Sequence, residues 1–226
     1  MSVGESGVSA PLPMETFPAL DAVTGIAHAF LGRVAGLDVK VDRAQALERL
    51  DLFHRAAREK SGLSRRYFLI GEQVHGREVA VVNEHTPVPV AAVDGLITAS
   101  SEVCLGVYVA DCCAVYLVDP VKRVIGLLHS GRKGSELGIT AAAIERMCSE
   151  FQSDPADIIV QLSPCIRPPN FEIDFAALIA EQARAAGVKQ VYDCGTCTAA
   201  NPDRYYSYRM EKGKTGRMLA LLALND

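Results

Sequence analysis

The chain contains no tryptophan, and aromatic residues of all kinds make up only 6% of its 226 positions. It also has no apolar stretch long enough to span a bilayer as a helix, so we expect no membrane partner. Basic residues are not in excess, because 23 Lys and Arg stand against 27 Asp and Glu, for a net charge of -4. Nucleic-acid-binding domains carry a basic footprint, so the composition also argues against nucleic acid as a partner.

Histidine is also scarce, and the features of an export signal are missing from residues 1–20. Five histidines are too few for the several copper centres of a multicopper oxidase. Residues 1–20 contain Gly, Ser and Pro without a basic start or an apolar core, which predicts a flexible leader and no signal peptide. The seven cysteines, an odd number, therefore fit free thiols in a reducing cytoplasm better than a disulfide framework.

Residues 21–226 are predicted to form one domain of the α+β class, with helices layered on sheets. Apolar periodicity predicts helices at 41–60, 134–151 and 175–186. Strands are expected at 67–70, 78–83, 96–99, 103–109, 114–118, 123–128 and 157–162. The turn at Asp119-Pro120 predicts a hairpin between the two strands that flank it. Residues 217–224 are predicted to form a further apolar element, which could be a helix or a strand.

Three side chains that readily bind zinc or copper each follow an apolar run: His75, His129 and a cysteine of the segment Asp111-Cys112-Cys113. Two imidazoles and one thiolate suit zinc, and three protein ligands leave a fourth position for water or substrate. In a strand, Cys112 and Cys113 would point to opposite faces, so either thiol is a candidate ligand. Each residue alone is better explained as a buried core residue, but together they favour a catalytic metal site.

Neighbouring residues suggest further roles. Asp111 adjoins the thiols, where it could act in acid–base chemistry or serve as a turn carboxylate. Arg132 and Lys133 lie between two glycines just before a predicted helix, a setting for phosphate or another anion, with a solvated turn as the alternative. Asp94 is interpreted as a turn former. The segment 205–209 could stack on a base or sugar, or form the partly buried face of a helix.

A set of short motifs, in one order along the chain, carries a family resemblance. The motifs are Gln73-Val74-His75-Gly76, Asp94-Gly95-Leu96-Ile97-Thr98, Ala110-Asp111-Cys112, His129-Ser130-Gly131, Ser163-Pro164 with Phe171-Glu172-Ile173, and Tyr206-Ser207-Tyr208-Arg209 through Thr215-Gly216-Arg217. From about His28 to the C-terminus, the chain resembles the YfiH, or laccase-domain, family of purine nucleoside phosphorylases, also called polyphenol oxidoreductases. It departs from the family at Arg132-Lys133, where relatives have Trp-Arg.

The resemblance implies a layered α/β/β/α sandwich and a zinc ion held by His75, Cys112 and His129, with copper as the alternative metal. It implies phosphorolysis of adenosine, inosine and methylthioadenosine, together with deamination of adenosine. The partners would then be a purine nucleoside and phosphate. In that setting Asp111 would move protons, and Arg132 and Lys133 would hold phosphate.

A cysteine hydrolase is the competing hypothesis. Cys112 or Cys113 would be the nucleophile and His129 the base. The cytotoxic-necrotizing-factor toxins resemble this fold and use such a pair, and a role in peptidoglycan editing has been proposed for the family. A thiolate committed to zinc cannot also be a free nucleophile, so metal content separates the two hypotheses.

Overall fold

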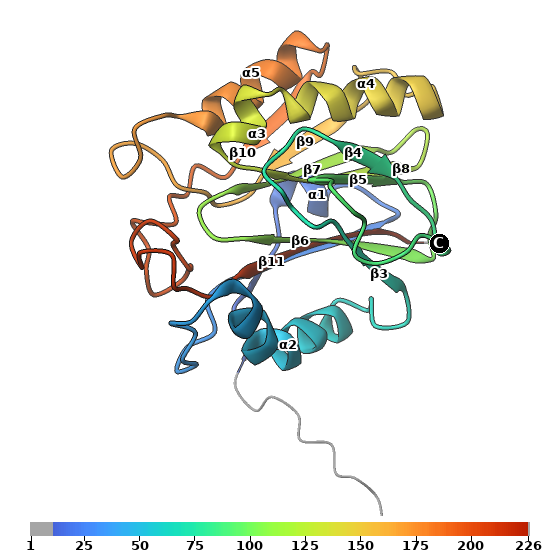
Figure 1. The fold of residues 1–226 in the computed structure, drawn as a ribbon. Helices are drawn as coiled ribbons and strands as arrows, with labels where there is room; N and C mark the ends of the chain where they lie inside the picture. The colour runs from blue at the N-terminus through green and yellow to red at the C-terminus, as the bar shows by residue number, and fades with distance from the viewer. Residues whose placement is uncertain (1–10, 226) are drawn as a thin grey trace, which may run out of the picture.

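Strands that are buried on both faces dominate the chain, and they build two stacked sheets with helices on the outer sides (Figure 1). The structure is a computed structural model and describes residues 11–225. The first sheet consists, in spatial order, of β1 (Met14–Glu15), β2 (Ile26–Leu31), β11 (Met218–Leu224), β6 (Val103–Val109) and β3 (Tyr67–Ile70). The apolar element at the C-terminal end is therefore a central strand, antiparallel to both of its neighbours.

The second sheet contains the predicted hairpin. In spatial order its strands are β10 (Gln190–Asp193), β9 (Ile159–Leu162), β7 (Cys113–Asp119), β8 (Val124–Ser130), β5 (Gly95–Thr98) and β4 (Val79–Val81). Strands β7 and β8 run antiparallel, with Asp119 opposite Val124 at the turn, which confirms the hairpin. At the other end, Cys113 pairs with Ser130, so the segments that hold Cys112 and His129 lie side by side.

Helices cover both outer faces. The helix α2 (Arg43–Lys60) packs on the first sheet, while α3 (Arg132–Glu136), α4 (Ile139–Phe151) and α5 (Phe175–Ala185) pack on the second (Figure 1). A short helix, α1 (Pro18–Asp21), precedes β2. The layers run α/β/β/α, as the family resemblance implied.

Period-two alternation explains how the layers hold together. In β11, Met218, Ala220 and Leu222 lie in the core between the two sheets, whereas Leu219 and Leu221 lie in the core beneath α2. All seven residues of this strand are buried. A third apolar core joins the second sheet to α4 and α5. Because each sheet is covered on both sides, its strands read as continuous apolar runs.

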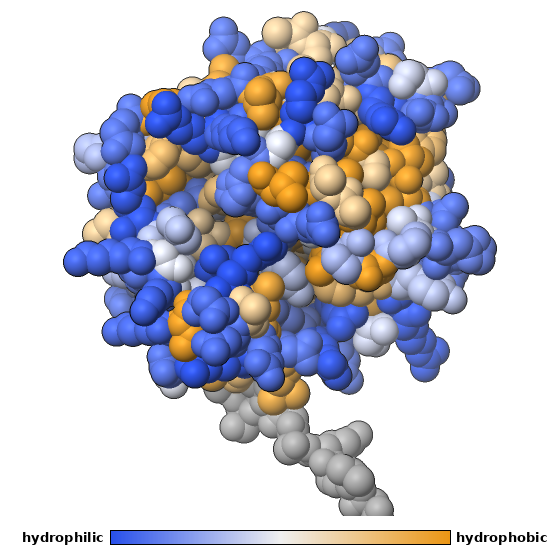
Figure 2. All heavy atoms as spheres, viewed as in Figure 1, coloured by the Kyte–Doolittle hydropathy of each residue, from blue (hydrophilic) through white to orange (hydrophobic). Residues whose placement is uncertain are grey.

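Two predictions need correction. The single helix predicted over 134–151 is two helices, because Gly138 has a left-handed φ of 81° that ends the first and starts the second. Residues 14–20 do not belong to a flexible leader, since Phe17 and Leu20 are buried and β1 pairs with β2; residues 1–10 lie outside the described part of the chain. Hydrophilic residues cover most of the face seen in Figure 2, with apolar patches between them. Within residues 11–225 no helix is both long and apolar enough to cross a membrane.

Candidate metal centre and its pocket

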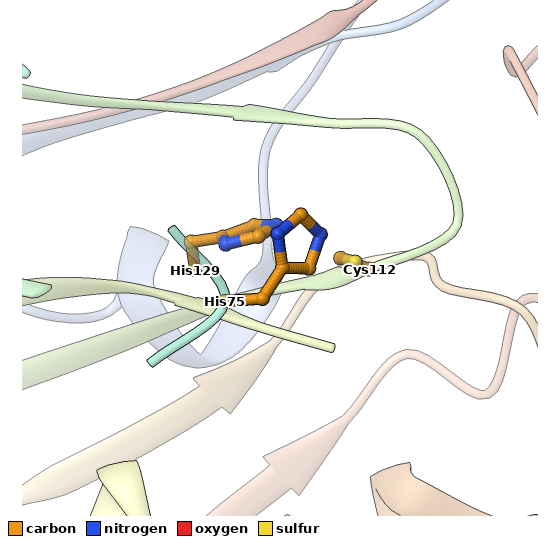
Figure 3. A group of neighbouring side chains, drawn as sticks. All are labelled: His75, Cys112 and His129. Atoms are coloured by element: carbon orange, nitrogen blue, oxygen red, sulfur yellow. The ribbon is translucent and has the colours of Figure 1, made fainter. Parts of the chain in front are cut away.

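The three predicted metal-binding side chains meet at one end of the second sheet (Figure 3). His75 comes from the loop between β3 and β4, Cys112 immediately precedes β7, and His129 is in β8. One ligand atom from each lies within 4.8 Å of the other two. The two imidazole rings are 4.8 Å apart and nearly perpendicular, at 82°. Residues far apart in sequence thus present two nitrogens and one sulfur to a single point.

A buried carboxylate holds this arrangement in place. Asp94 accepts a hydrogen bond from Nδ1 of His129 at 2.8 Å and from the backbone N–H of His75 at 2.9 Å. Its second oxygen accepts from the backbone N–H groups of Val74, at 3.1 Å, and Gly76, at 2.7 Å. These bonds support the loop in which His75 has a left-handed φ of 61°, a conformation that is uncommon for a residue other than glycine.

The interpretation of Asp94 as a turn former was therefore incomplete. The residue orients one imidazole and fixes the loop that carries the other, which is how metal-binding histidines are commonly positioned. Strand pairing was the signal that could have revealed this role. Gly95 pairs with Leu128, so Asp94 lies beside His129 across the two strands.

The same contacts set the charges at the site. Burial opposes ionisation of the Cys112 thiol, but the neighbouring charge of His129 and hydrogen bonds from His129 and His75 lower its pKa to about 6. Burial also opposes the charged form of His129, but Cys112 and Asp94 together raise its pKa to about 9. In the metal-free protein at neutral pH, the pair is thus a thiolate beside an imidazolium. A thiolate is the form in which cysteine binds metals or acts as a nucleophile.

The donor set and the space around it fit a metal ion. Because Nδ1 of His129 bonds to Asp94, its Nε2 is the nitrogen left to serve as a ligand. Gly131 follows on the adjacent strand end, and a Cβ there would lie 2.5 Å from the sulfur of Cys112. A glycine at this position therefore leaves the thiolate room to stay where the imidazoles can share a metal with it.

The structure separates the two candidate thiols. Cys113 is fully buried in the core beneath α4 and α5, with its sulfur 3.7 Å from the backbone oxygen of Ser163. Cys112 lies with the histidines, as the family resemblance implied. The alternation along the strand is what directs the two sulfurs into different layers.

The cluster opens into a cavity of about 1120 Å³. Its apolar wall includes Ile166, Phe171, Phe175 and Tyr208, with the rings of Phe171 and Phe175 5.8 Å apart. Its cations are Arg43, Arg132, Lys133, Arg209, Lys212, Lys214 and Arg217, against three carboxylates, Asp42, Asp111 and Glu136. A cavity with an aromatic side and an excess of positive charge suits a flat ring system together with an anion.

The residues predicted to assist the metal all line this cavity. Arg132 and Lys133 form the first turn of α3 and are exposed, and the guanidinium of Arg132 bonds to Glu136 at 2.9 Å. Asp111 is buried and has a left-handed φ of 78°. Its carboxylate accepts from the hydroxyl of Thr198 at 2.7 Å.

The other oxygen of that carboxylate accepts from the hydroxyl of Ser207 at 3.0 Å and from the backbone N–H of Arg209 at 2.7 Å. Asp111 thus ties the loop that contains residues 205–209 to the strand end at Cys112. This loop forms turns and no helix, so the alternative of a helix face was wrong. Tyr205 and Tyr206 are buried, and Tyr208 is left on the cavity wall.

The remaining histidines lie away from the cluster. His28 accepts from the backbone N–H of Phe17, and burial lowers its pKa. His54 is buried in α2, which lowers its pKa to about 4, and His85 is an exposed loop residue. Within residues 11–225 there is one group of metal-binding side chains of this kind, which does not match a set of several copper centres.

Comparison with known proteins agrees with the fold and shows the family. The sequence model of the family described as "Multi-copper polyphenol oxidoreductase laccase" matches residues 32–177 and 170–225, and the chain belongs to this family. Purine nucleoside phosphorylase SCO2081 of Streptomyces coelicolor is 31% identical over 182 residues, 68% of this chain and 73% of that protein. Purine nucleoside phosphorylase YlmD of Bacillus subtilis is 27% identical over 166 residues, 60% of each chain. The matched region thus spans less than two thirds of the latter relative.

The crystal structure of YlmD from Geobacillus stearothermophilus has the same fold. It superposes with a TM-score of 0.78 over 90% of this chain and 93% of that chain, at 24% identity. At this identity the likeness establishes the α+β architecture, and the function has to be argued from the site itself.

Proposed function

We propose that this protein is a zinc-dependent purine nucleoside phosphorylase that acts on adenosine, inosine and methylthioadenosine and also deaminates adenosine. The observation that carries the proposal is the position of the cluster. His75, Cys112 and His129 converge at the wall of a cavity that is also lined by aromatic side chains and by cations. The names of the matched relatives agree with the phosphorylase activity.

Different residues of the cavity would bind the purine and the phosphate. Phe171 and Tyr208 offer flat apolar surface to a purine, and Arg132 and Lys133 attract phosphate. A zinc ion at the cluster would supply Lewis-acid activation of an oxygen nucleophile. In phosphorolysis a phosphate oxygen forms a bond to C1′ of the ribose as the bond to the purine nitrogen breaks, and the purine takes up a proton. In deamination water replaces the amino group, which leaves as ammonia.

Asp111 is the group proposed to move protons in both reactions, because it lies beside Cys112 and lines the cavity. We place the protein in the cytoplasm, since all seven cysteines are free thiols. Its partners are a purine nucleoside and phosphate, with no nucleic acid and no membrane.

A nucleoside screen tests the proposal. Zinc-loaded protein should convert adenosine, inosine and methylthioadenosine to the free base and a ribose 1-phosphate, and only when phosphate is present. Adenosine should also give inosine without phosphate. Chromatography of the products separates the two activities. Absence of base release from all three nucleosides at millimolar phosphate would refute the phosphorylase.

Asp111→Asn should retain zinc but lower turnover by roughly 10²- to 10⁴-fold, the range for loss of a general acid or base. Ser207→Ala is the matched control, because it removes one hydrogen bond to Asp111 and keeps the carboxylate. If Asp111→Asn turns over like the wild type, or if both variants lose equal activity, Asp111 is a structural tie and moves no proton.

One observation favours the competing cysteine hydrolase. Cys112, His129 and Asp94 form a thiolate–imidazolium pair oriented by a carboxylate, which is also the arrangement of a nucleophilic cysteine. His75 is the residue that such a triad does not need, and it is the third donor of a metal site. Stoichiometric zinc in the purified protein supports the phosphorylase. Rapid alkylation of Cys112 at neutral pH that added metal does not slow supports the hydrolase.

A further inference from the structure

Arg217 is a cavity residue to which the proposed function gives no role. It precedes β11, is half-buried, and lines the same cavity as the metal cluster. Its Nη1 donates to the backbone oxygens of Thr215, at 2.7 Å, and Gly216, at 2.9 Å. Within residues 11–225, its Nε and Nη2 have no hydrogen-bond partner, and neither atom is sealed from solvent. Two donors of a fixed guanidinium are thus available to a ligand.

Arg217 also has no salt-bridge partner within residues 11–225. Arg132 is paired with Glu136 and Arg209 with Glu172, both at 3 Å or less, whereas Arg217 forms no ion pair in the described part of the chain. Its charged neighbour on the cavity wall is Arg43, whose Nη1 bonds only to a backbone oxygen. Burial and then the like charge of Arg43 lower the pKa of Arg217. An anion between two such guanidiniums would relieve both effects.

The backbone around Arg217 is held firmly. The Nε2 of His54 bonds to the backbone oxygen of Arg217 at 3.2 Å, and a Cβ at Gly216 would lie 2.6 Å from the ring of Tyr206. Burial lowers the pKa of His54 to about 4, so its imidazole is neutral at neutral pH and donates its Nε2 proton to this oxygen. Arg132 and Lys133, in contrast, are exposed on a helical turn. A fixed side chain loses less conformational entropy on binding than a free one.

We propose that Arg217, assisted by Arg43, is the residue that contacts the phosphate co-substrate directly, while Arg132 and Lys133 only attract it to the cavity. This inference rests on the proposed phosphorolysis. Arg217 lines the same cavity as Cys112, His75 and His129. Its two free N–H donors match the spacing of two phosphate oxygens.

The test is a titration of zinc-loaded protein with inorganic phosphate, followed by ³¹P NMR, together with the phosphate KM of nucleoside cleavage. Arg217→Gln should weaken phosphate binding roughly 10- to 100-fold, the effect of losing charged hydrogen bonds. Arg217→Lys keeps the charge but loses the paired N–H donors of the guanidinium, so its affinity for phosphate should lie between those of Arg217→Gln and the wild type. Lys212→Gln removes one exposed cavity cation and should change the Kd by no more than about threefold.

The outcomes separate this inference from the function on which it rests. Equal weakening in Arg217→Gln and Lys212→Gln would mean that only the general field matters, and the assignment would fail. It would also fail if Arg132→Ala/Lys133→Ala lost phosphate while Arg217→Gln kept it, or if the wild type bound no phosphate. Should Arg217→Gln not fold, wild-type affinity in Arg217→Lys would overturn the assignment. Phosphate binding that requires Arg217 without any nucleoside cleavage would uphold the site and refute the phosphorylase.

Discussion

Replacing Cys112 by alanine should remove the bound metal and abolish nucleoside cleavage, whereas Cys113→Ala should keep both. The thiol of Cys112 is one of three donors within 4.8 Å of one another, while that of Cys113 packs in a separate core. Two imidazoles alone bind zinc far more weakly than two imidazoles and a thiolate. Metal content by mass spectrometry of the purified variants, expressed per chain, measures the difference.

The Cys113 variant is the matched control, because it removes the same atom from the next residue. It should lower the free energy of unfolding by about 1 kcal/mol through the small void that it leaves in the core. Equal metal loss in both variants would show that the thiols have been assigned wrongly. Full metal content in Cys112→Ala would show that the metal is held elsewhere.

Asp94→Asn should weaken metal binding by about 10- to 100-fold, the usual effect of removing the partner that orients a metal-binding histidine. Each carboxylate oxygen of Asp94 accepts two hydrogen bonds, and all four donors belong to residues that carry or border the ligands. An amide supplies only one acceptor oxygen, so its NH₂ group would face N–H donors. Competition with a chromophoric chelator gives the affinity.

Asp119→Asn provides the control for this experiment. Asp119 is also a buried carboxylate that accepts from two backbone N–H groups, but at the opposite end of the β7–β8 hairpin. Asp94→Asn should be less stable by about 1–3 kcal/mol through an unsatisfied buried group. In Asp119→Asn the amide oxygen can keep both backbone hydrogen bonds, because the second oxygen of Asp119 has no partner in the described residues. Only Asp94→Asn should lose metal affinity. A parallel loss in both variants would trace the effect to stability of the hairpin and not to orientation of His129.

Much of the fold was predictable because the strands have strong local signals. The strands β3 and β6 have the bounds that their apolar runs predicted, and α2 differs by two residues at its start. The strand type of β11 was left open because a strand buried on both faces shows no alternation of apolar and polar residues. The break at Gly138 was missed because the apolar pattern continues on both sides of it.

The three residues of the candidate metal cluster could be predicted from the sequence, whereas the residues that hold them in place could not. Histidine and cysteine at strand ends indicate metal binding by residue type alone. Pairing of β7 with β8 then brings Cys112 beside His129. Asp94 orients His129 and the proposed role of Arg217 depends on its place in the cavity; both involve residues distant in sequence, which no local pattern reveals. Alternation along the strand predicts that Cys112 and Cys113 face opposite layers, but only the folded structure shows which sulfur faces the histidines.

Zinc titration of metal-stripped protein tests the central claim most directly, that one metal ion held by His75, Cys112 and His129 supports nucleoside phosphorolysis. Protein treated with a chelator should cleave no adenosine in the presence of phosphate. Activity should then rise in proportion to added zinc and reach its plateau at about one equivalent per chain, as expected for a single site with three protein ligands. Full phosphate-dependent cleavage by the stripped protein would contradict the account. So would the same zinc-dependent rise in activity in the Cys112→Ala variant.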